Sequence, residues 1–351
     1  MTAKSVEAAI DSQPIGGRPA KGYLPQLDGL RALAVTLVLV HHFITPVEFA
    51  GHVGVDVFFV LSGYLITSIL LVESAKYGRI RLKRFYVRRA IRLYPPLLLV
   101  IAVLVVPGVV LAPSLLRFAA ETLFAVTYTT PVAIELVNNA SWMWRHTWSL
   151  GVEEIFYLLW PLLLIVATRL GWRLRTRAAV ALGTGAAMTA VQVLTTLDGD
   201  RMSVLLRAGG LFFGCAVALY LHGSERSFRS AWGWAGLGLI AASVVLSTAT
   251  QNDAIGVLLT VVGTTMALLH AVTGRSALTR ALSVPPLAYT GKISYELYLW
   301  HYPILVLLGW WTGLAFIDLA LVAVPISVAA AVGAHHLLVH RIDGWKQRFP
   351  Y

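Results

Sequence analysis

Long apolar stretches, separated by short polar connections, recur along almost the whole chain after residue 22. Several of them reach about 18 residues or more, which is the length that a helix needs to cross a bilayer. The pattern therefore predicts an all-α fold, a polytopic membrane helix bundle of about ten transmembrane helices. The predicted spans are 28–46, 53–73, 94–112, 146–168, 178–197, 203–222, 231–249, 254–273, 293–312 and 315–339.

A single membrane domain is expected to cover residues 23–345. The preceding segment, 1–22, is polar and has no apolar region of the kind found in a secretory signal peptide. We therefore expect 1–22 to be a disordered cytoplasmic tail and the first span to act as the insertion signal.

The first span contains residues that a bilayer helix rarely tolerates. The run LPQLDGLRALAVTLVLVHHF at 24–43 includes Asp28, Arg31, His41 and His42. Arg31 and His42 are about three turns apart, so they share one helix face and are separated by about 16 Å along the axis. Asp28 precedes Arg31 by one turn on that same face. Because buried ionisable groups are retained mainly where they pair or line a polar cavity, this face is the first candidate site.

A second polar group lies at one end of the fourth predicted span, in HTWSLGVEEIFYLLWP at 146–161. Spacings of about four and seven residues place most of its polar side chains on one face, with the second glutamate about 100° away. Two interpretations remain open. The glutamates are solvated beside an interfacial tryptophan belt, or they face the interior and pair with histidine or arginine. The residues concerned are His146, Ser149, Glu153, Glu154 and Tyr157, with Trp142, Trp144 and Trp148 as the belt.

Two further polar residues interrupt apolar spans. His301 falls near the middle of 293–312 and is followed by Pro303, which loosens the helix beside it. Asp56 lies near the outer end of the second span, where its carboxylate could orient an imidazole. A buried histidine with a purely structural role, and simple helix packing around Asp56, are the alternatives.

Composition supports the membrane assignment and removes other classes of site. Of the 351 residues, 58% are hydrophobic and 13% are charged, against about 25% charged in soluble domains. The only cysteine, Cys215, excludes an internal disulfide. His335, His336 and His340 cluster near the end of the last span, where interfacial histidines are more common than metal ligands, so no metal site is expected.

The net charge of +11 reflects membrane topology rather than nucleic-acid binding. Nearly all lysines and arginines fall in alternate connections, which predicts cytoplasmic N- and C-termini and a multi-pass protein of the cell membrane. Only Arg117, Arg145 and Arg201 fall in connections on the other side. The longest basic connection, 74–93, alternates cations with apolar residues, so we expect an interfacial helix there that contacts anionic lipid or a phosphorylated ligand. Pro95 and Pro96 are then expected to start the third span.

Five motifs in order resemble the membrane acyltransferase 3 family. They are LDGLRALAV with the following HH, GVDVFFVLSGYLIT, RRAIRLYP, HTWSLGVEEIFYLLWP and SYELYLWHYP, and they cover spans one to four and nine. The resemblance implies transfer of an acyl group, often acetyl, from acyl-CoA to a sugar hydroxyl. It places the family's arginine and histidine of the first span on Arg31 and His42. Some members carry an additional extracytoplasmic SGNH-type domain, which we do not expect in this chain.

The resemblance and the charge distribution together give each candidate residue a role. Acyl transfer needs a base for the hydroxyl proton, and CoA needs cations for its phosphates on the inner side. We expect acyl-CoA as co-substrate, no tightly bound cofactor, and a sugar-containing acceptor and membrane lipid as partners. The expected catalytic residues are His42, Glu153 and Glu154; those for CoA are Arg31, Arg88, Arg89 and Arg92; and those that bind or orient substrate are Asp28, Asp56, His146, Trp148, Ser149, Tyr157 and His301.

Three questions stay open at this stage. His42 acts either as a general base or as an acyl carrier. The same buried charges would also suit a proton-coupled transporter. A structural subunit of a glycan assembly is the third possibility.

Overall fold

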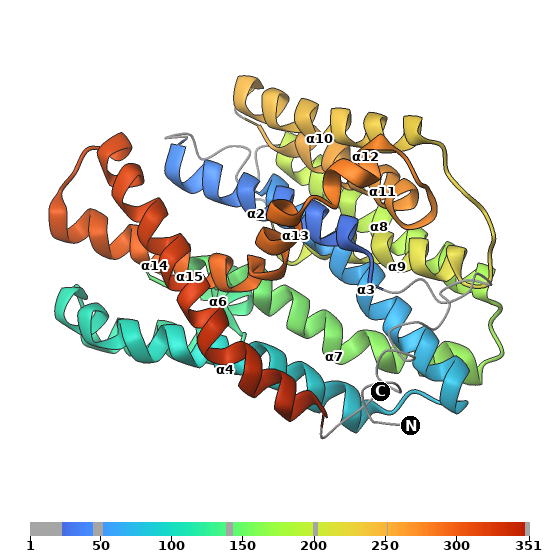
Figure 1. Cartoon of the computed structure of the whole chain (residues 1–351), viewed down its shortest axis with the longest axis horizontal. Helices are drawn as coiled ribbons and strands as arrows, with labels where there is room; N and C mark the ends of the chain where they lie inside the picture. Colours follow the sequence, from blue (N-terminus) through green and yellow to red (C-terminus); the bar gives the residue numbers. More distant parts are fainter. Residues whose placement is uncertain (1–22, 45–51, 138–142, 199–202, 251, 348–351) are drawn as a thin grey trace.

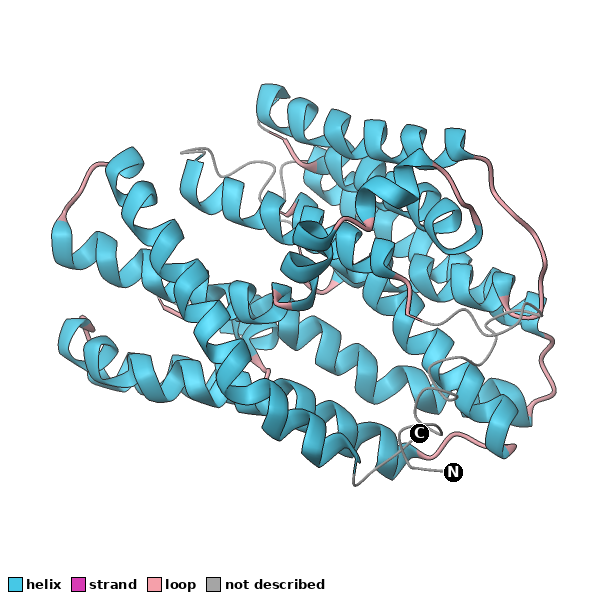
Figure 2. Ribbon diagram, viewed as in Figure 1, coloured by secondary structure: helices cyan, strands magenta, loops and turns pink. Residues whose placement is uncertain are grey.

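The computed structural model describes residues 23–44, 52–137, 143–198, 203–250 and 252–347. Every regular element within these ranges is helical (Figure 2). The longer helices are α2 (Pro25–Ile44), α3 (Val53–Tyr77), α4 (Leu82–Leu111), α7 (Trp148–Arg169), α8 (Leu174–Leu197), α10 (Ser230–Thr250), α11 (Ala254–Thr273), α14 (Ser294–Thr312) and α15 (Phe316–Gln347). The shorter ones are α5 (Leu115–Val126), α6 (Thr130–Val137), η1 (Arg145–Thr147), η2 (Leu206–Ala208), α9 (Gly209–Leu221), α12 (Ala277–Leu282) and α13 (Pro285–Lys292).

The all-α, multi-pass membrane architecture is confirmed. In the described part of the chain, 7 helices are long and apolar enough to cross a membrane, namely α3, α4, α7 together with η1, α8, α10, α11 and α15. The other three predicted spans also form helices, α2, α9 and α14, but do not meet both criteria. Helix α9 has only 13 residues because the 3₁₀ turn η2 precedes it. The number of membrane spans, about ten, therefore remains a prediction.

Helix α2 lies in the interior, where α3, α11, α13, α14 and α15 pack around it (Figure 1). Helix α3 packs closely on α9, and small residues make this possible. A Cβ atom at Gly63 would collide with the carbonyl oxygen of Leu211, and one at Gly214 would collide with that of Val60. Such close backbone approach is the usual basis of helix association in membranes. It keeps α3 rigidly placed beside α2, where the polar residues lie.

The prediction for residues 74–96 is wrong in two respects. Helix α3 continues to Tyr77, and Gly78 ends it with a left-handed φ of 68°. Helix α4 then runs without interruption from Leu82 to Leu111, so Pro95 and Pro96 lie inside it instead of starting a new helix. Membrane helices accommodate internal prolines because neighbouring groups satisfy the backbone. One consequence is that the basic residues of 83–92 belong to the same helix as a membrane span.

Candidate functional site

A cavity of about 160 Å³ opens among α2, α3, α4, α7 and α14. Its apolar walls come mainly from α3, and its polar groups come from all five helices. It therefore brings together residues that are far apart in sequence. The polar lining comprises Arg31, Ser62, Arg89, Arg92, Ser149, Glu153, Tyr157, Ser294, Tyr295 and Tyr298. We call this space the arginine cavity.

Two of its three arginines are held by carboxylates. The guanidinium of Arg31 is 3.7 Å from Asp28, one turn earlier on α2, and Asp28 also accepts a hydrogen bond of 2.5 Å from the Tyr23 hydroxyl. Arg89 donates to Glu154 at 3.0 Å. Asp28 and Glu154 thus act as positioning groups for cations that face the cavity.

The third cation of the cavity has no such partner. Arg92 is exposed, lines the arginine cavity, and forms no ion pair with any residue that the structure describes. Among the residues that line the cavity, three arginines accompany one carboxylate, that of Glu153. Arg88, predicted to act with these residues, is half-buried and is not among the lining residues.

The two glutamates of α7 have different partners. Glu153 lines the cavity and accepts a hydrogen bond of 2.7 Å from the Ser62 hydroxyl on α3. Glu154 points to Arg89, whose guanidinium also lies 3.0 Å from the ring centre of Tyr157. Both carboxylates are therefore engaged inside the bundle, and the interpretation as freely solvated interfacial glutamates is wrong.

A second cluster gathers three imidazoles from three separate elements, His42 of α2, His146 of η1 and His301 of α14. The ring centres of His42 and His301 are 5.0 Å apart, and those of His146 and His301 are 5.6 Å apart. Tyr302 completes the group, with its ring 5.3 Å from that of His42 and 5.2 Å from that of His146. We call this group the histidine centre.

Backbone contacts define the protonation pattern of two of these rings. His42 Nδ1 is 2.8 Å from the carbonyl oxygen of Val38, and His301 Nδ1 is 3.1 Å from that of Leu297. Since a carbonyl oxygen only accepts, each Nδ1 carries the proton and donates it. The Nε2 atom of each neutral ring is then left with its lone pair available, which is what a base or nucleophile requires.

Several polar atoms of the two sites are buried without a hydrogen-bond partner in the described structure. They are His301 Nε2, both ring nitrogens of His146, and the hydroxyl of Ser294 at the wall of the arginine cavity. Buried polar atoms are normally satisfied, so a group of orphaned ones indicates that a polar ligand or water occupies the space. No group of three or more histidine, cysteine or acidic side chains in the described ranges is arranged to hold a metal ion.

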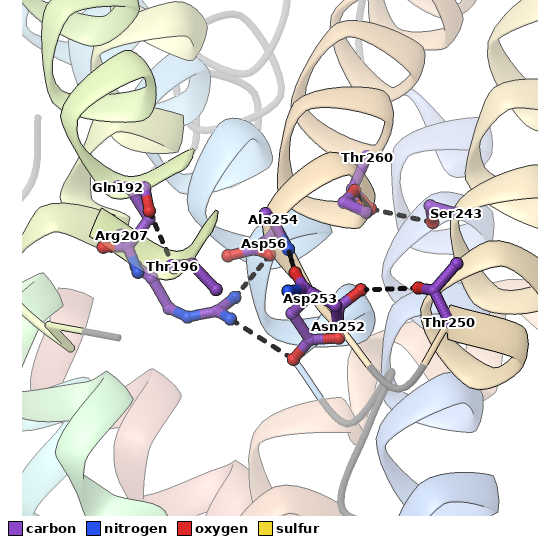
Figure 3. A network of polar contacts seen from close by, with 11 residues as sticks. Asp56, Gln192, Thr196, Arg207, Ser243, Thr250, Asn252, Asp253, Ala254 and Thr260 are labelled. Atoms are coloured by element: carbon purple, nitrogen blue, oxygen red, sulfur yellow. Dashed lines mark hydrogen bonds and ion pairs between the residues drawn. The ribbon is translucent and has the colours of Figure 1, made fainter. Parts of the chain in front are cut away.

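Two predicted site residues lie elsewhere. Asp56 does not contact an imidazole through its carboxylate; instead it accepts a hydrogen bond of 2.7 Å from Arg207, which also lies 3.8 Å from Asp253 (Figure 3). Trp148 is buried with its ring 6.1 Å from Phe59, in the packing between α3 and α7. Trp148 therefore faces the core in this structure and not an open surface.

Sequence reasoning missed the polar partners that complete these clusters. Arg207 had one available signal, since a cation inside an apolar stretch requires an acidic partner. Ser62, Tyr298 and Tyr302 lie within the motifs GVDVFFVLSGYLIT and SYELYLWHYP, but their spacing alone does not distinguish a site hydroxyl from a packing one. Their importance follows only from which helices the fold brings together.

Comparison with family profiles gives a match over most of the chain. The profile of the acyltransferase domain matches residues 24–336. Among curated proteins, the peptidoglycan O-acetyltransferase OatA of Listeria monocytogenes is 30% identical over 314 residues, covering 83% of this chain and 50% of the relative. The O-acetyltransferase OatA of Staphylococcus aureus is 32% identical over 316 residues, covering 81% of this chain and 51% of the relative.

A third relative extends the same picture. The putative peptidoglycan O-acetyltransferase YrhL of Bacillus subtilis is 33% identical over 320 residues, covering 81% of this chain and 49% of the relative. The chain thus spans about half the length of the curated relatives that it matches. No solved structure gives a significant match.

Proposed function

The chain belongs to the acyltransferase 3 family, and from this membership and the site geometry we propose that it is a membrane O-acetyltransferase. It would move an acetyl group from acyl-CoA to a hydroxyl of a sugar in a surface glycan. The observation that carries the proposal is the pairing of two sites on one helix. The arginine cavity includes Arg31, and the histidine centre includes His42, about 16 Å further along α2.

The arginine cavity has the properties of a site for the donor. CoA is a polyanion, and arginine binds phosphate through several charge-assisted hydrogen bonds. Arg92 at the mouth and Arg31 and Arg89 within would meet the phosphates. The unpartnered Ser294 hydroxyl would meet an amide of the pantetheine arm. The distribution of basic residues along the sequence supports a cytoplasmic location for this mouth and for both termini.

The histidine centre has the properties of a reaction site. In direct transfer, His42 Nε2 takes the proton of the acceptor hydroxyl, whose oxygen attacks the thioester carbon. The carbon–sulfur bond then breaks, and the proton passes to the CoA thiolate. In the two-step version, Nε2 itself takes the acetyl group before the acceptor does. His301 Nε2, which carries a lone pair, would accept a hydrogen bond from the acceptor hydroxyl, and the protonated ring nitrogen of His146 would donate to the developing oxyanion.

The names of the relatives support a sugar polymer as acceptor. Three of them are described as O-acetyltransferases, two specifically of peptidoglycan. We propose the same class of acceptor for this chain, a carbohydrate hydroxyl on the outer side of the membrane. Glu153, held by Ser62 at the edge of the cavity, would orient the acceptor or an imidazole.

The test uses purified protein in lipid nanodiscs with radiolabelled acetyl-CoA and soluble glycan fragments. We expect CoA release and labelled ester with the wild type, and loss of both by at least about 10²-fold in His42→Ala, the contribution typical of a general base. His41→Ala, which changes the neighbouring imidazole, is the matched control. Full activity of His42→Ala would contradict the proposal.

The same material tests the competing function. Proton-coupled transport, the alternative raised by the buried charges, predicts substrate movement across liposomes without any CoA release. Rapid acid quench followed by mass spectrometry distinguishes the two chemical versions. An acetyl group on His42 is expected only in the two-step version.

A further inference from the structure

Two hydroxyl groups stand between the arginine cavity and the histidine centre. The Tyr298 hydroxyl donates to the carbonyl oxygen of His146 at 2.7 Å, and it lies 2.5 Å from Ser149 Oγ. Ser149 Oγ also lies 3.4 Å from the same carbonyl oxygen, so the two hydroxyls share one acceptor and either can donate to the other. Both side chains are buried, so these bonds form away from bulk water.

The pair contacts both sites at once. Ser149 and Tyr298 line the arginine cavity, whereas His42, His146 and His301 do not. On its other side the Tyr298 ring lies 5.5 Å from the ring centres of both His146 and His301. The hydroxyl bonds also tie α14 to the start of α7. Tyr298 is thus part of the wall that divides the two spaces.

We propose that the Ser149–Tyr298 pair is a barrier that positions the thioester and controls whether the acetyl group passes to the acceptor or to water. This inference rests on the proposed function, because it takes the donor to enter by the arginine cavity and react at His42. The thioester cannot reach the imidazole while the wall is closed. The pair therefore has to part when the donor arm extends, and it closes the donor space at other times.

Two reactions compete once the thioester is exposed. In transfer, the acceptor oxygen bonds to the acetyl carbon, the carbon–sulfur bond breaks, and the hydroxyl proton ends on the CoA sulfur. In hydrolysis, water takes the place of the acceptor, and the products are acetate and free CoA. Exclusion of water is what favours transfer. A barrier that opens only with a seated donor arm limits hydrolysis.

The critical variant is Tyr298→Phe, which keeps the ring and removes both hydrogen bonds. We expect the ratio of acetate formed to acetyl ester formed to rise about fivefold or more, the change that one hydrogen bond of ordinary net strength is worth. Ser149→Ala removes the shorter bond and the weak 3.4 Å contact of Ser149 with the His146 carbonyl but keeps the bond from Tyr298 to that carbonyl, so the ratio should rise in the same direction by less. Tyr64→Phe is the matched control, because Tyr64 is a buried tyrosine of α3 that does not line the cavity.

The readout separates a barrier from a merely structural role. The folded fraction of each variant is first determined by size-exclusion chromatography. The protein in nanodiscs is then incubated with acetyl-CoA, with and without glycan fragments, and the amounts of acetate, acetyl ester and free CoA are measured. A structural defect lowers hydrolysis and transfer in parallel and leaves their ratio unchanged, which would overturn the barrier. Should Tyr298→Phe fail to fold, the ratio in Ser149→Ala decides alone. A wild type that releases no CoA would instead overturn the proposed function.

Discussion

Two buried groups of charges in this protein are built in opposite ways. In the Asp56–Arg207–Asp253 group, a single cation lies between two carboxylates, and the side chain of Arg207 is only 1% exposed (Figure 3). The arginine cavity is lined by three arginines and by Glu153; two of the arginines pair with Asp28 and Glu154, and the third, Arg92, is exposed. The first group encloses its cation between two carboxylates, whereas the second lies beside a cavity that one arginine, Arg92, faces without an ion pair in the described structure.

The difference teaches how to separate structural from functional charge in a membrane bundle. Both groups look equally anomalous in the sequence, since each places ionisable residues inside apolar spans. A cation enclosed by carboxylates ties elements together, here α3, η2 and the N-cap residue of α11. An arginine that faces a cavity without an ion pair has hydrogen-bond donors left for an anionic ligand. Each prediction below removes charge from one group or its surroundings.

The largest effect is expected for Arg207→Gln. It leaves Asp56 and Asp253 facing each other in the interior without a cation, and breaking a buried pair in this way costs about 3–5 kcal/mol. The free energy of unfolding, measured by chemical denaturation in detergent, should fall by that order. Adding Asp56→Asn to Arg207→Gln should restore part of the loss. A normal unfolding free energy together with lost transfer would mean that this group is functional instead.

A smaller, purely functional effect is expected for Arg92→Ala. Its guanidinium has no ion pair in the described structure to lose, so the unfolding free energy should change little. A hydrogen bond to a charged group is worth about 1.5–3 kcal/mol, which corresponds to roughly a 10- to 100-fold rise in KM for acetyl-CoA. The measurement is initial CoA release against donor concentration. An unchanged KM would show that the donor phosphates bind elsewhere.

The sequence predicted one stripe of candidate residues but not the residues that the fold gathers around it. The stripe of Asp28, Arg31 and His42 follows from helical periodicity alone, because the structure places all three residues on one helix, α2. The neighbourhood of His42 does not, since His146 and His301 reach it from elements more than a hundred residues away along the chain. Tertiary packing sets such contacts, and a periodic pattern contains no information about them.

Two predictions made from local sequence were also wrong, one about prolines and one about the partner of a buried carboxylate. Proline starts helices in water, so Pro95 and Pro96 predicted a boundary, yet α4 continues through both. Asp56 was expected to orient an imidazole because it lies near the outer end of the second span, but the fold supplies Arg207, a stronger partner for a carboxylate. The choice of partner depends on the packing of α3 against α9, which small residues allow and which their positions alone do not reveal.

A further, intermediate effect is expected for Glu154→Gln. The substitution removes the charge that holds Arg89 at 3.0 Å, while the ring of Tyr157 still supports the guanidinium. We expect KM for acetyl-CoA to rise about fivefold through poorer positioning of Arg89, with kcat nearly unchanged. Glu153→Gln is the matched variant, because its amide oxygen can still accept the hydrogen bond from Ser62. A fall in kcat for Glu154→Gln with KM unchanged would assign Glu154 to the chemical step.

The smallest effect is expected for Lys83→Ala, and it is the sharpest check on the comparison. Lys83 and Arg92 are both exposed cations of α4, but only Arg92 lines the arginine cavity. They are about 13 Å apart along the helix axis, further than the Debye length of about 8 Å at physiological salt. If position at the cavity decides donor binding, Lys83→Ala should change KM for acetyl-CoA by less than about twofold while Arg92→Ala changes it strongly. Equal changes in the two variants would mean that the overall positive field of α4, and not the unmatched charge at the cavity, attracts the donor.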